Sequence, residues 1–302
     1  MINQNIPTFK DQMELVRLGL AKYSDHNGVR TFKYSKQVVY SNLWDTNEFL
    51  MECRGHCYEI ESGKLLALPP RKTFNWKENN AGSLTNRNTE VTAYKKYNGF
   101  MACASNYNGE LLVSTTGTAS SSFADMAKVM LQEREVLHEE GVTIAYEIIH
   151  PEDPHIVNEE IGINMLGIRR HPNKYSQNTD FWPWDTGEVF QGRFGDLVKS
   201  LETCKHEGWM VYSETGEVFK LKSPYYLSKK KLMRMPPAKV LKFFKEFDKV
   251  MKEELQWFPE YMKVISKKII SEVWIDDWIT CNDQQRRGII EEYEKELGVY
   301  EI

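Results

Sequence analysis

The spacing of apolar residues changes from a strand-and-turn pattern to a helical pattern near residue 229. Residues 105–226 are rich in strand and turn signals, among them Asn108-Gly109, a dipeptide that favours a two-residue hairpin turn because both residues tolerate a positive φ. The residues that follow carry apolar side chains at helical spacing instead. We therefore expect an α+β domain over residues 1–227 and a small all-α domain over residues 228–302.

Composition limits the class of protein. The chain has 302 residues, a formal net charge of −4 and 41% hydrophobic residues, which is enough to bury a core and argues against disorder. Its five cysteines form no C-x-x-C pair, which fits reduced thiols and speaks against a zinc site. No apolar run approaches the roughly 18 residues of a membrane-spanning helix, and the N-terminus lacks a signal-peptide core. We expect a cytoplasmic monomer with no membrane segment.

Charge is polarised within the C-terminal part. Residues 229–252 hold nine Lys and Arg against two acids, a balance of +7, whereas residues 253–302 hold six against twelve, a balance of −6. The basic segment is either a solvated face or a patch for a polyanion such as RNA, since clustered lysines can neutralise phosphates without a globally basic protein. Its candidate phosphate contacts are Lys229, Lys230, Lys231 and Arg234. The tryptophans Trp257, Trp274 and Trp278 are expected in the core of these helices.

An ordered set of charged residues carries the candidate chemistry. Each member alone is more often a solvated lysine or an acid paired with an arginine, but that explanation is hard to sustain for the whole set. A second hairpin is predicted over residues 209–222, and a two-residue turn at Thr215-Gly216 would place Trp209 opposite Lys222. Glu207 and both lysines, Lys220 and Lys222, would then cluster at neighbouring positions. The set comprises Lys96-Tyr97-Asn98-Gly99, Glu147 in the apolar run 143–149, Glu207-Gly208-Trp209, and Lys220 with Lys222.

This set resembles the motifs of the covalent nucleotidyltransferases, the ATP-dependent ligases and mRNA capping enzymes. The resemblance implies that Lys96 attacks the α-phosphate of the nucleotide, because Lys96, unlike Lys95, has a glycine three positions on, Gly99. A lysine is nucleophilic only when neutral, so its pKa of about 10.4 must fall, and burial or neighbouring cations lower it. Lys220 and Lys222 are the expected cations, and they would also stabilise charge on the phosphate.

Two upstream segments resemble the bacteriophage RNA ligase 1 family more specifically. They are Glu52-Cys53-Arg54-Gly55 and Lys72-Thr73-Phe74-Asn75. The resemblance covers roughly residues 25–227 and implies that Arg54 and Lys72 contact the nucleotide, with Tyr34 as a further contact. It also implies an ATP-grasp-like ligase core of antiparallel sheets and helices. The ATP site would then be built by Tyr34, Arg54, Lys72, Gly99, Glu147, Glu207, Lys220 and Lys222, with Glu147 and Glu207 as ligands of Mg²⁺ or Mn²⁺.

The chain departs from the family pattern at two positions. Asn98 stands where an aspartate is common, which we do not take as a loss of activity. Thr116, in the segment Ser114–Thr118, stands where the family has a lysine, so one cation of the phosphate site is missing or comes from elsewhere.

The resemblance implies an ATP-dependent RNA ligase that joins 5′-phosphate and 3′-hydroxyl ends through a lysyl-AMP and an AMP-capped RNA. Its substrate would be RNA, including nicked tRNA in RNA repair, in the cytoplasm of a phage-infected host if the protein is viral. The alternatives are a DNA ligase or GTP-dependent capping enzyme on the same core, and a catalytically inactive RNA-binding relative. The first alternative predicts a β-stranded OB-fold after residue 227, where this sequence predicts helices.

Overall fold

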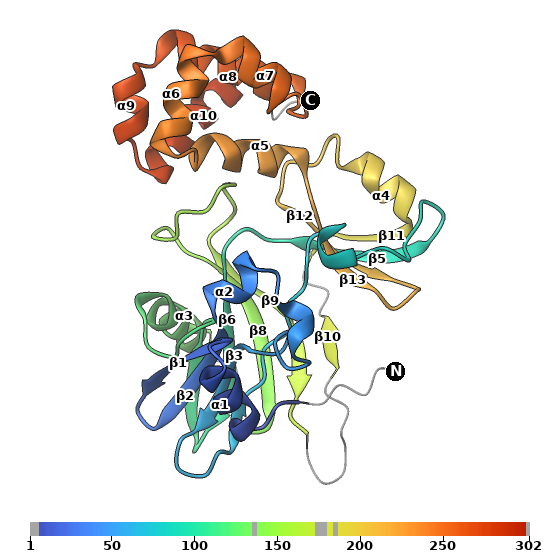
Figure 1. Ribbon diagram of the computed structural model, residues 1–302, viewed down its shortest axis with the longest axis vertical. Helices are drawn as coiled ribbons and strands as arrows, with labels where there is room; N and C mark the ends of the chain where they lie inside the picture. The colour runs from blue at the N-terminus through green and yellow to red at the C-terminus, as the bar shows by residue number, and fades with distance from the viewer. Residues whose placement is uncertain (1–5, 135–137, 173–179, 184–186, 300–302) are drawn as a thin grey trace. The chain divides into compact units, whose positions relative to one another are not determined.

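The structure, a computed structural model, describes residues 6–134, 138–172, 180–183 and 187–299 (Figure 1). Antiparallel sheets, helices and a helical C-terminal region make it a mixed α+β protein, which confirms the predicted fold class. The backbone forms two compact units, each built from separate stretches of sequence. Unit 1 comprises Met1–Thr73, Gly99–Pro151 and Glu160–Thr186, and unit 2 comprises Phe74–Asn98, Glu152–Glu159 and Gly187–Ile302.

Unit 1 contains two antiparallel sheets, of strand order β1-β2-β3-β4 and β10-β9-β8-β6-β7. The strands of the first are Ala21–His26, Val29–Tyr34, Arg54–Glu59 and Leu65–Ala67. The strands of the second are β6 Phe100–Tyr107, β7 Glu110–Ser114, β8 Val142–Ile149, β9 Gly162–Arg170 and β10 Phe181–Pro183. The helices are α1 Phe9–Arg17, α2 Lys36–Tyr40, the short 3₁₀ turn η1 Trp44–Thr46, and α3 Ser122–Glu133.

The hairpin predicted around Asn108-Gly109 is confirmed. Tyr107 of β6 pairs with Glu110 of β7, so the loop has two residues. The φ angles of the two loop residues, Asn108 and Gly109, are 54° and 82°. Two left-handed residues form the turn that matches the twist of paired strands.

A buried ion pair links β9 to the segment that leads into β3. The guanidinium of Arg169 donates to both oxygens of Glu52, at 2.6 and 3.0 Å. Burial alone would raise the pKa of Glu52, but the hydrogen bonds from His56 and Arg169 lower it to about 2. Glu52, the first residue of the Glu52–Gly55 segment, therefore joins β9 to the start of β3, the strand that carries Arg54.

Unit 2 contains one antiparallel sheet, of strand order β11-β5-β12-β13. Phe194 and Leu197 of a short helix pack against Val91 and Val211 of this sheet. The elements are the 3₁₀ turn η2 Glu78–Asn80, β5 Glu90–Lys96, β11 Val189–Arg193, α4 Phe194–Ser200, β12 Gly208–Ser213 and β13 Val218–Lys222.

The second predicted hairpin forms, but its predicted register is wrong by one residue. Gly208, not Trp209, lies opposite Lys222. The loop has three residues rather than two, because the amide of Gly216 bonds to the carbonyl of Ser213 and Gly216 adopts φ +83°. A turn followed by a left-handed glycine is the common three-residue solution for a hairpin.

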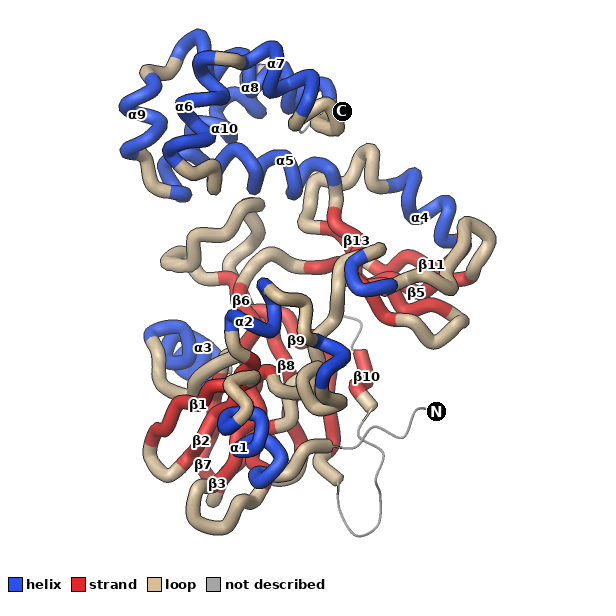
Figure 2. The backbone as a smooth tube through the Cα atoms, viewed as in Figure 1, coloured by secondary structure: helices blue, strands red, loops and turns tan. Residues whose placement is uncertain are grey.

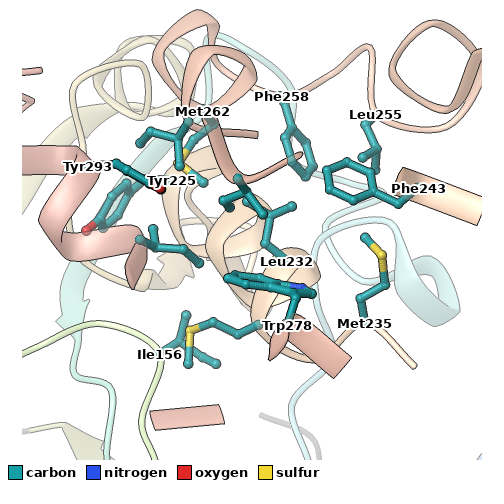
Figure 3. Packing of buried hydrophobic residues seen from close by; sticks show 14 of the residues in the cluster. Ile156, Tyr225, Leu232, Met235, Phe243, Leu255, Phe258, Met262, Trp278 and Tyr293 are labelled. Carbon is teal, nitrogen blue, oxygen red and sulfur yellow. The ribbon is translucent and has the colours of Figure 1, made fainter. Parts of the chain in front are cut away.

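From α5 onward the described chain is helix and loop alone, as Figure 2 shows. Leu232, Phe258 and Trp278 meet in the buried apolar cluster of these helices (Figure 3). The predicted domain boundary between residues 227 and 228 falls inside α5, and as a division into domains it stays a prediction. The helices are α5 Pro224–Met233, α6 Pro237–Lys245, α7 Phe247–Glu253, α8 Glu260–Glu272, α9 Ile275–Thr280 and α10 Asp283–Glu296.

Two expectations about these helices need correction. Trp278 is buried, but Trp257 and Trp274 are 45% and 80% exposed, so helical spacing alone did not identify the core. Lys229 is fully buried on α5, where its ammonium group lies 3.0 Å from Glu294 and 3.1 Å from Glu291. Lys229 is therefore part of the packing between α5 and α10 and not of a solvent-facing basic patch. Within the described residues, no helix combines the length and hydropathy needed to cross a membrane.

Candidate active site

Lys96 is the last residue of β5, which lies beside β12 in the sheet of unit 2. Its direct partner on β12 is Gly208, and the partner of Gly208 on β13 is Lys222. Directly opposed residues of antiparallel strands project from the same face, so Lys96 and Lys222 flank a position that has no side chain. A Cβ on Gly208 would lie 2.1 Å from the carbonyl oxygen of Leu221, so this position requires glycine.

The carboxylate of Glu207 bridges the two lysines. Its Oε2 lies 3.1 Å from Lys96 Nζ and its Oε1 lies 3.1 Å from Lys222 Nζ. Glu207 is 3% exposed. Burial raises the pKa of this carboxyl, but the ammonium groups of Lys96 and Lys222 outweigh the effect and the pKa is lowered overall. The structure thus brings three predicted site residues into one buried charge cluster, which we call the Lys96 cluster.

Asn98 completes the Lys96 cluster, although the sequence analysis assigned it no role. Its side-chain oxygen accepts the amides of Ile156 and Val157, at 2.7 and 2.8 Å. Because two N–H donors converge on that atom, the other side-chain atom is the amide nitrogen, which donates to Glu207 Oε2 at 3.1 Å. The identity of Asn98 is therefore set by its neighbours, because only an amide both accepts and donates here.

The neighbouring Lys95 has a different partner. Its ammonium group lies 3.9 Å from Glu159, a residue that also accepts the backbone amide of Asn98. Adjacent residues of a strand point to opposite faces, so only one of Lys95 and Lys96 can face Glu207. Lys96 is the lysine beside Glu207, and its role as the nucleophile stays a prediction.

Lys220 lies two residues before Lys222 on β13, on the same face, and opposite Met210. Its backbone also pairs with the segment after Thr73, since its amide bonds to Phe74 and its carbonyl accepts from Trp76, both at 2.8 Å. Of the predicted cluster of Glu207 with both Lys220 and Lys222, the structure shows the contact between Glu207 and Lys222, at 3.1 Å, while Lys220 lies two residues earlier on β13.

Gly99 and Glu147 belong to unit 1. The amide of Gly99 donates to Glu147 Oε1 at 3.1 Å, and Glu147 is buried on β8. A Cβ on Gly99 would lie 2.1 Å from the carbonyl oxygen of Ile148, so any side chain here would push β6 away from β8. The glycine of the Lys96–Gly99 tetrad therefore has a steric cause, close approach of two strands.

Two of the other predicted nucleotide contacts gather around one tryptophan in unit 1. The rings of Tyr34 and Trp44 meet edge to face with centroids 4.8 Å apart, and Lys72 Nζ lies 5.5 Å from the Trp44 ring. Arg54, on β3, donates to the sulfur of Met101 at 3.6 Å. Tyr34 and Lys72 are thus brought together, while Arg54 has a different neighbour.

Lys33 is a second residue that the sequence did not indicate. A Cβ on Gly117 would lie 3.0 Å from Lys33 Cδ and 3.5 Å from its Nζ, so the ammonium group lies against the loop that holds Thr116. Burial lowers the pKa of Lys33, and the charge of Arg54 lowers it further. The half-buried ammonium group of Lys33 therefore lies next to the segment in which Thr116 stands where the resembled family has a lysine.

No family model matches the chain, and no curated protein matches it. Among solved structures it is similar to an archaeal ATP-dependent RNA ligase, with 13% identity, a TM-score of 0.49, and coverage of 99% of this chain and 81% of that one.

Two other solved structures are similar to a lower degree. A candidate ATP-dependent DNA ligase of Aquifex aeolicus has 13% identity, a TM-score of 0.45, and coverage of 96% of this chain and 73% of that one. An RNA ligase of Naegleria gruberi, solved with ATP and Mn, has 12% identity, a TM-score of 0.36, and coverage of 75% and 84%. Identities this low leave activity and substrate to be argued from the site.

Proposed function

We propose that the protein is an ATP-dependent RNA ligase that becomes adenylylated on Lys96. The observation that carries this proposal is the Lys96 cluster: two lysines 3.1 Å from one buried carboxylate, with glycine between them. A solvated lysine pair would have no reason to share a buried glutamate. The ECRG and KTFN segments, which resemble the RNA ligase 1 family, support the choice of RNA over DNA.

In the first step, Lys96 Nζ forms a bond to the α-phosphorus of ATP while the bond to the bridging α–β oxygen breaks. Pyrophosphate leaves with that oxygen, and the proton of Lys96 passes to its hydrogen-bond partner Glu207 and on to solvent. Lys222 stays beside Glu207 as the cation that stabilises charge on the transferring phosphate. The 5′-phosphate of RNA then displaces Lys96 from AMP, and a 3′-hydroxyl displaces AMP.

The acid residues fit a divalent metal in part. In the described residues, no group of three or more His, Cys, Asp or Glu side chains is arranged to hold a metal ion. Mg²⁺ needs only one or two carboxylates when phosphates supply its other ligands, and there it neutralises triphosphate charge. Both oxygens of Glu207 accept from ammonium groups and Glu147 Oε1 accepts the amide of Gly99, so a metal would compete with these contacts at either predicted ligand.

We propose that Lys33 takes the place of the cation that is missing at Thr116. We expect Lys33→Met to lower the rate of lysyl-AMP formation about tenfold, because a half-buried cation at a phosphate contributes about 1–2 kcal/mol. Adding Thr116→Lys to that variant should restore most of the rate, measured as initial labelling with ATP. A Lys33→Met variant that labels at the wild-type rate would remove Lys33 from the site.

The test of the proposed function is covalent labelling. The protein is incubated with α-labelled ATP and Mg²⁺, denatured, and examined for label on the chain. We expect label from ATP and little or none from GTP. Labelling by GTP alone would assign the protein to the capping class, and no labelling by either nucleotide would favour an inactive RNA-binding relative.

A further inference from the structure

A groove of about 470 Å³ opens on the surface of unit 2, between α5, the start of α6 and the segment after α7. Its floor is apolar and includes Met235, which also belongs to the buried cluster in Figure 3. Its rim carries four cations and one indole and no acidic side chain. These five residues are Lys230, Lys231, Arg234, Lys239 and Trp257.

Three of the rim cations are available to a ligand. Arg234 is already paired with Asp283, at 3.1 Å. By contrast, within the ranges that the structure describes, no carboxylate lies within 4 Å of the ammonium groups of Lys230, Lys231 or Lys239. The charges of Lys239 and Lys231 reach Glu254, but that carboxylate is paired with Lys242 at 2.7 Å. Three lysines without a directly paired acid around one groove favour an anionic ligand.

Trp257 adds a flat apolar surface to this charge. Its indole nitrogen donates to the carbonyl of Glu254 at 3.1 Å, and its ring packs edge to face on Phe258 with centroids 4.7 Å apart. These contacts hold the ring in place, yet 45% of the residue is exposed. A fixed, exposed aromatic ring among cations is the arrangement that binds single-stranded nucleic acid, because bases stack on the ring while phosphates meet the lysines.

The groove is connected to the Lys96 cluster within unit 2. The ring of Tyr226 lies between the two, with its centroid 4.7 Å from Lys222 Nζ and 5.6 Å from Lys230 Nζ. Burial lowers the pKa of Lys230, and electrostatic repulsion from the charge of Lys222 lowers it further. A ligand at Lys230 is therefore separated by the Tyr226 ring from Lys222, the cation that we place at the reacting phosphate.

We infer that this groove binds the single-stranded RNA that adjoins the end being joined, with one base stacked on Trp257 and the backbone phosphates at Lys230, Lys231 and Lys239. The inference rests on the proposed function and adds to it the place where RNA is held. An acidic protein segment would also meet the lysines, but it would have no use for the exposed indole.

The test separates charge from stacking. Binding of a 5′-phosphorylated single-stranded RNA of about twelve nucleotides is measured by fluorescence anisotropy over a range of salt. The double variant Lys231→Gln/Lys239→Gln should weaken binding and lower the slope of log affinity against log salt by about 1.4, since each lost phosphate contact removes about 0.7. The control Lys245→Gln/Lys252→Gln changes the same charge at exposed lysines outside the groove and should keep the slope.

Trp257→Ala should weaken RNA binding about tenfold or more and leave the salt slope unchanged, because a stacked base is lost and no counterion is involved. Trp274→Ala, which removes an even more exposed indole outside the groove, should have no effect. Thermal unfolding of each variant checks that the fold is kept.

Labelling with ATP in the same preparations keeps the two claims apart. Groove variants that bind RNA like the wild type while the wild type labels with ATP would overturn the groove and leave the ligase proposal standing. Absence of labelling would overturn the ligase proposal, and the RNA data would still decide the groove. A poly-glutamate peptide that displaces the RNA equally well from wild type and Trp257→Ala would show a general anion site and would also overturn the inference.

Discussion

Lys96→Ala is expected to abolish the formation of covalent enzyme–AMP, a loss of at least about four orders of magnitude, because the variant lacks the only atom that we assign to the bond with phosphorus. The fold should be kept, since Lys96 is at the end of β5 and its charge partner Glu207 retains Lys222. The measurement is label on the denatured chain after incubation with ATP.

Lys95→Ala is the matched control for this variant. It removes the adjacent lysine, which faces Glu159 rather than Glu207, so labelling should stay close to that of the wild type. Sealing of RNA that already carries AMP on its 5′-phosphate bypasses the attack by lysine, so Lys96→Ala should retain part of that activity. If Lys96→Ala is still labelled with AMP and Lys95→Ala is not, the nucleophile is Lys95 rather than Lys96.

Asn98→Asp is expected to lower the rate of lysyl-AMP formation about a hundredfold, even though aspartate is the residue that the resembled family commonly has. The new carboxylate would keep the amides of Ile156 and Val157, but its second oxygen would face Glu207 Oε2 at about the 3.1 Å of the present hydrogen bond. A lost hydrogen bond to a charged group and a like-charge contact together cost about 3 kcal/mol.

The pH dependence of Asn98→Asp distinguishes this cause from misfolding. Two adjacent carboxyls raise the pKa of one of them, so the pair takes up a proton as pH falls and the hydrogen bond to Glu207 forms again. The ratio of variant to wild-type rate should therefore rise as pH falls from about 8 to about 6. A variant that labels like the wild type at every pH would show that Asn98 does not position Glu207.

The sequence predicted local features well and distant partners poorly. The Asn108-Gly109 turn and the helical character of the C-terminal part follow from residues close together in the chain, and both are found. The partner of Glu52 is 117 residues away, so no local pattern could show that this acid serves a buried ion pair. The same holds for Asn98 in unit 2 and Lys33 in unit 1, because the neighbours of each depend on how distant segments of its own unit pack.

Two errors have identifiable physical causes. The register of the hairpin before Lys222 depends on one residue of loop length, and Thr215-Gly216 is compatible with a loop of two or three residues. The burial of residues on the C-terminal helices was predicted wrongly because both lysine and tryptophan side chains occur in buried and in exposed positions. Lys229 is buried by its pairing with acids of α10, which helical spacing cannot reveal.

The site of adenylylation can be mapped by mass spectrometry. The wild-type protein is incubated with ATP and Mg²⁺, its intact mass is recorded, and the modified peptide is fragmented. We expect one added AMP per chain, attached through a phosphoramidate bond to Lys96. AMP on any other residue, or no AMP on a folded protein that binds ATP, would contradict the assignment of Lys96 as the nucleophile.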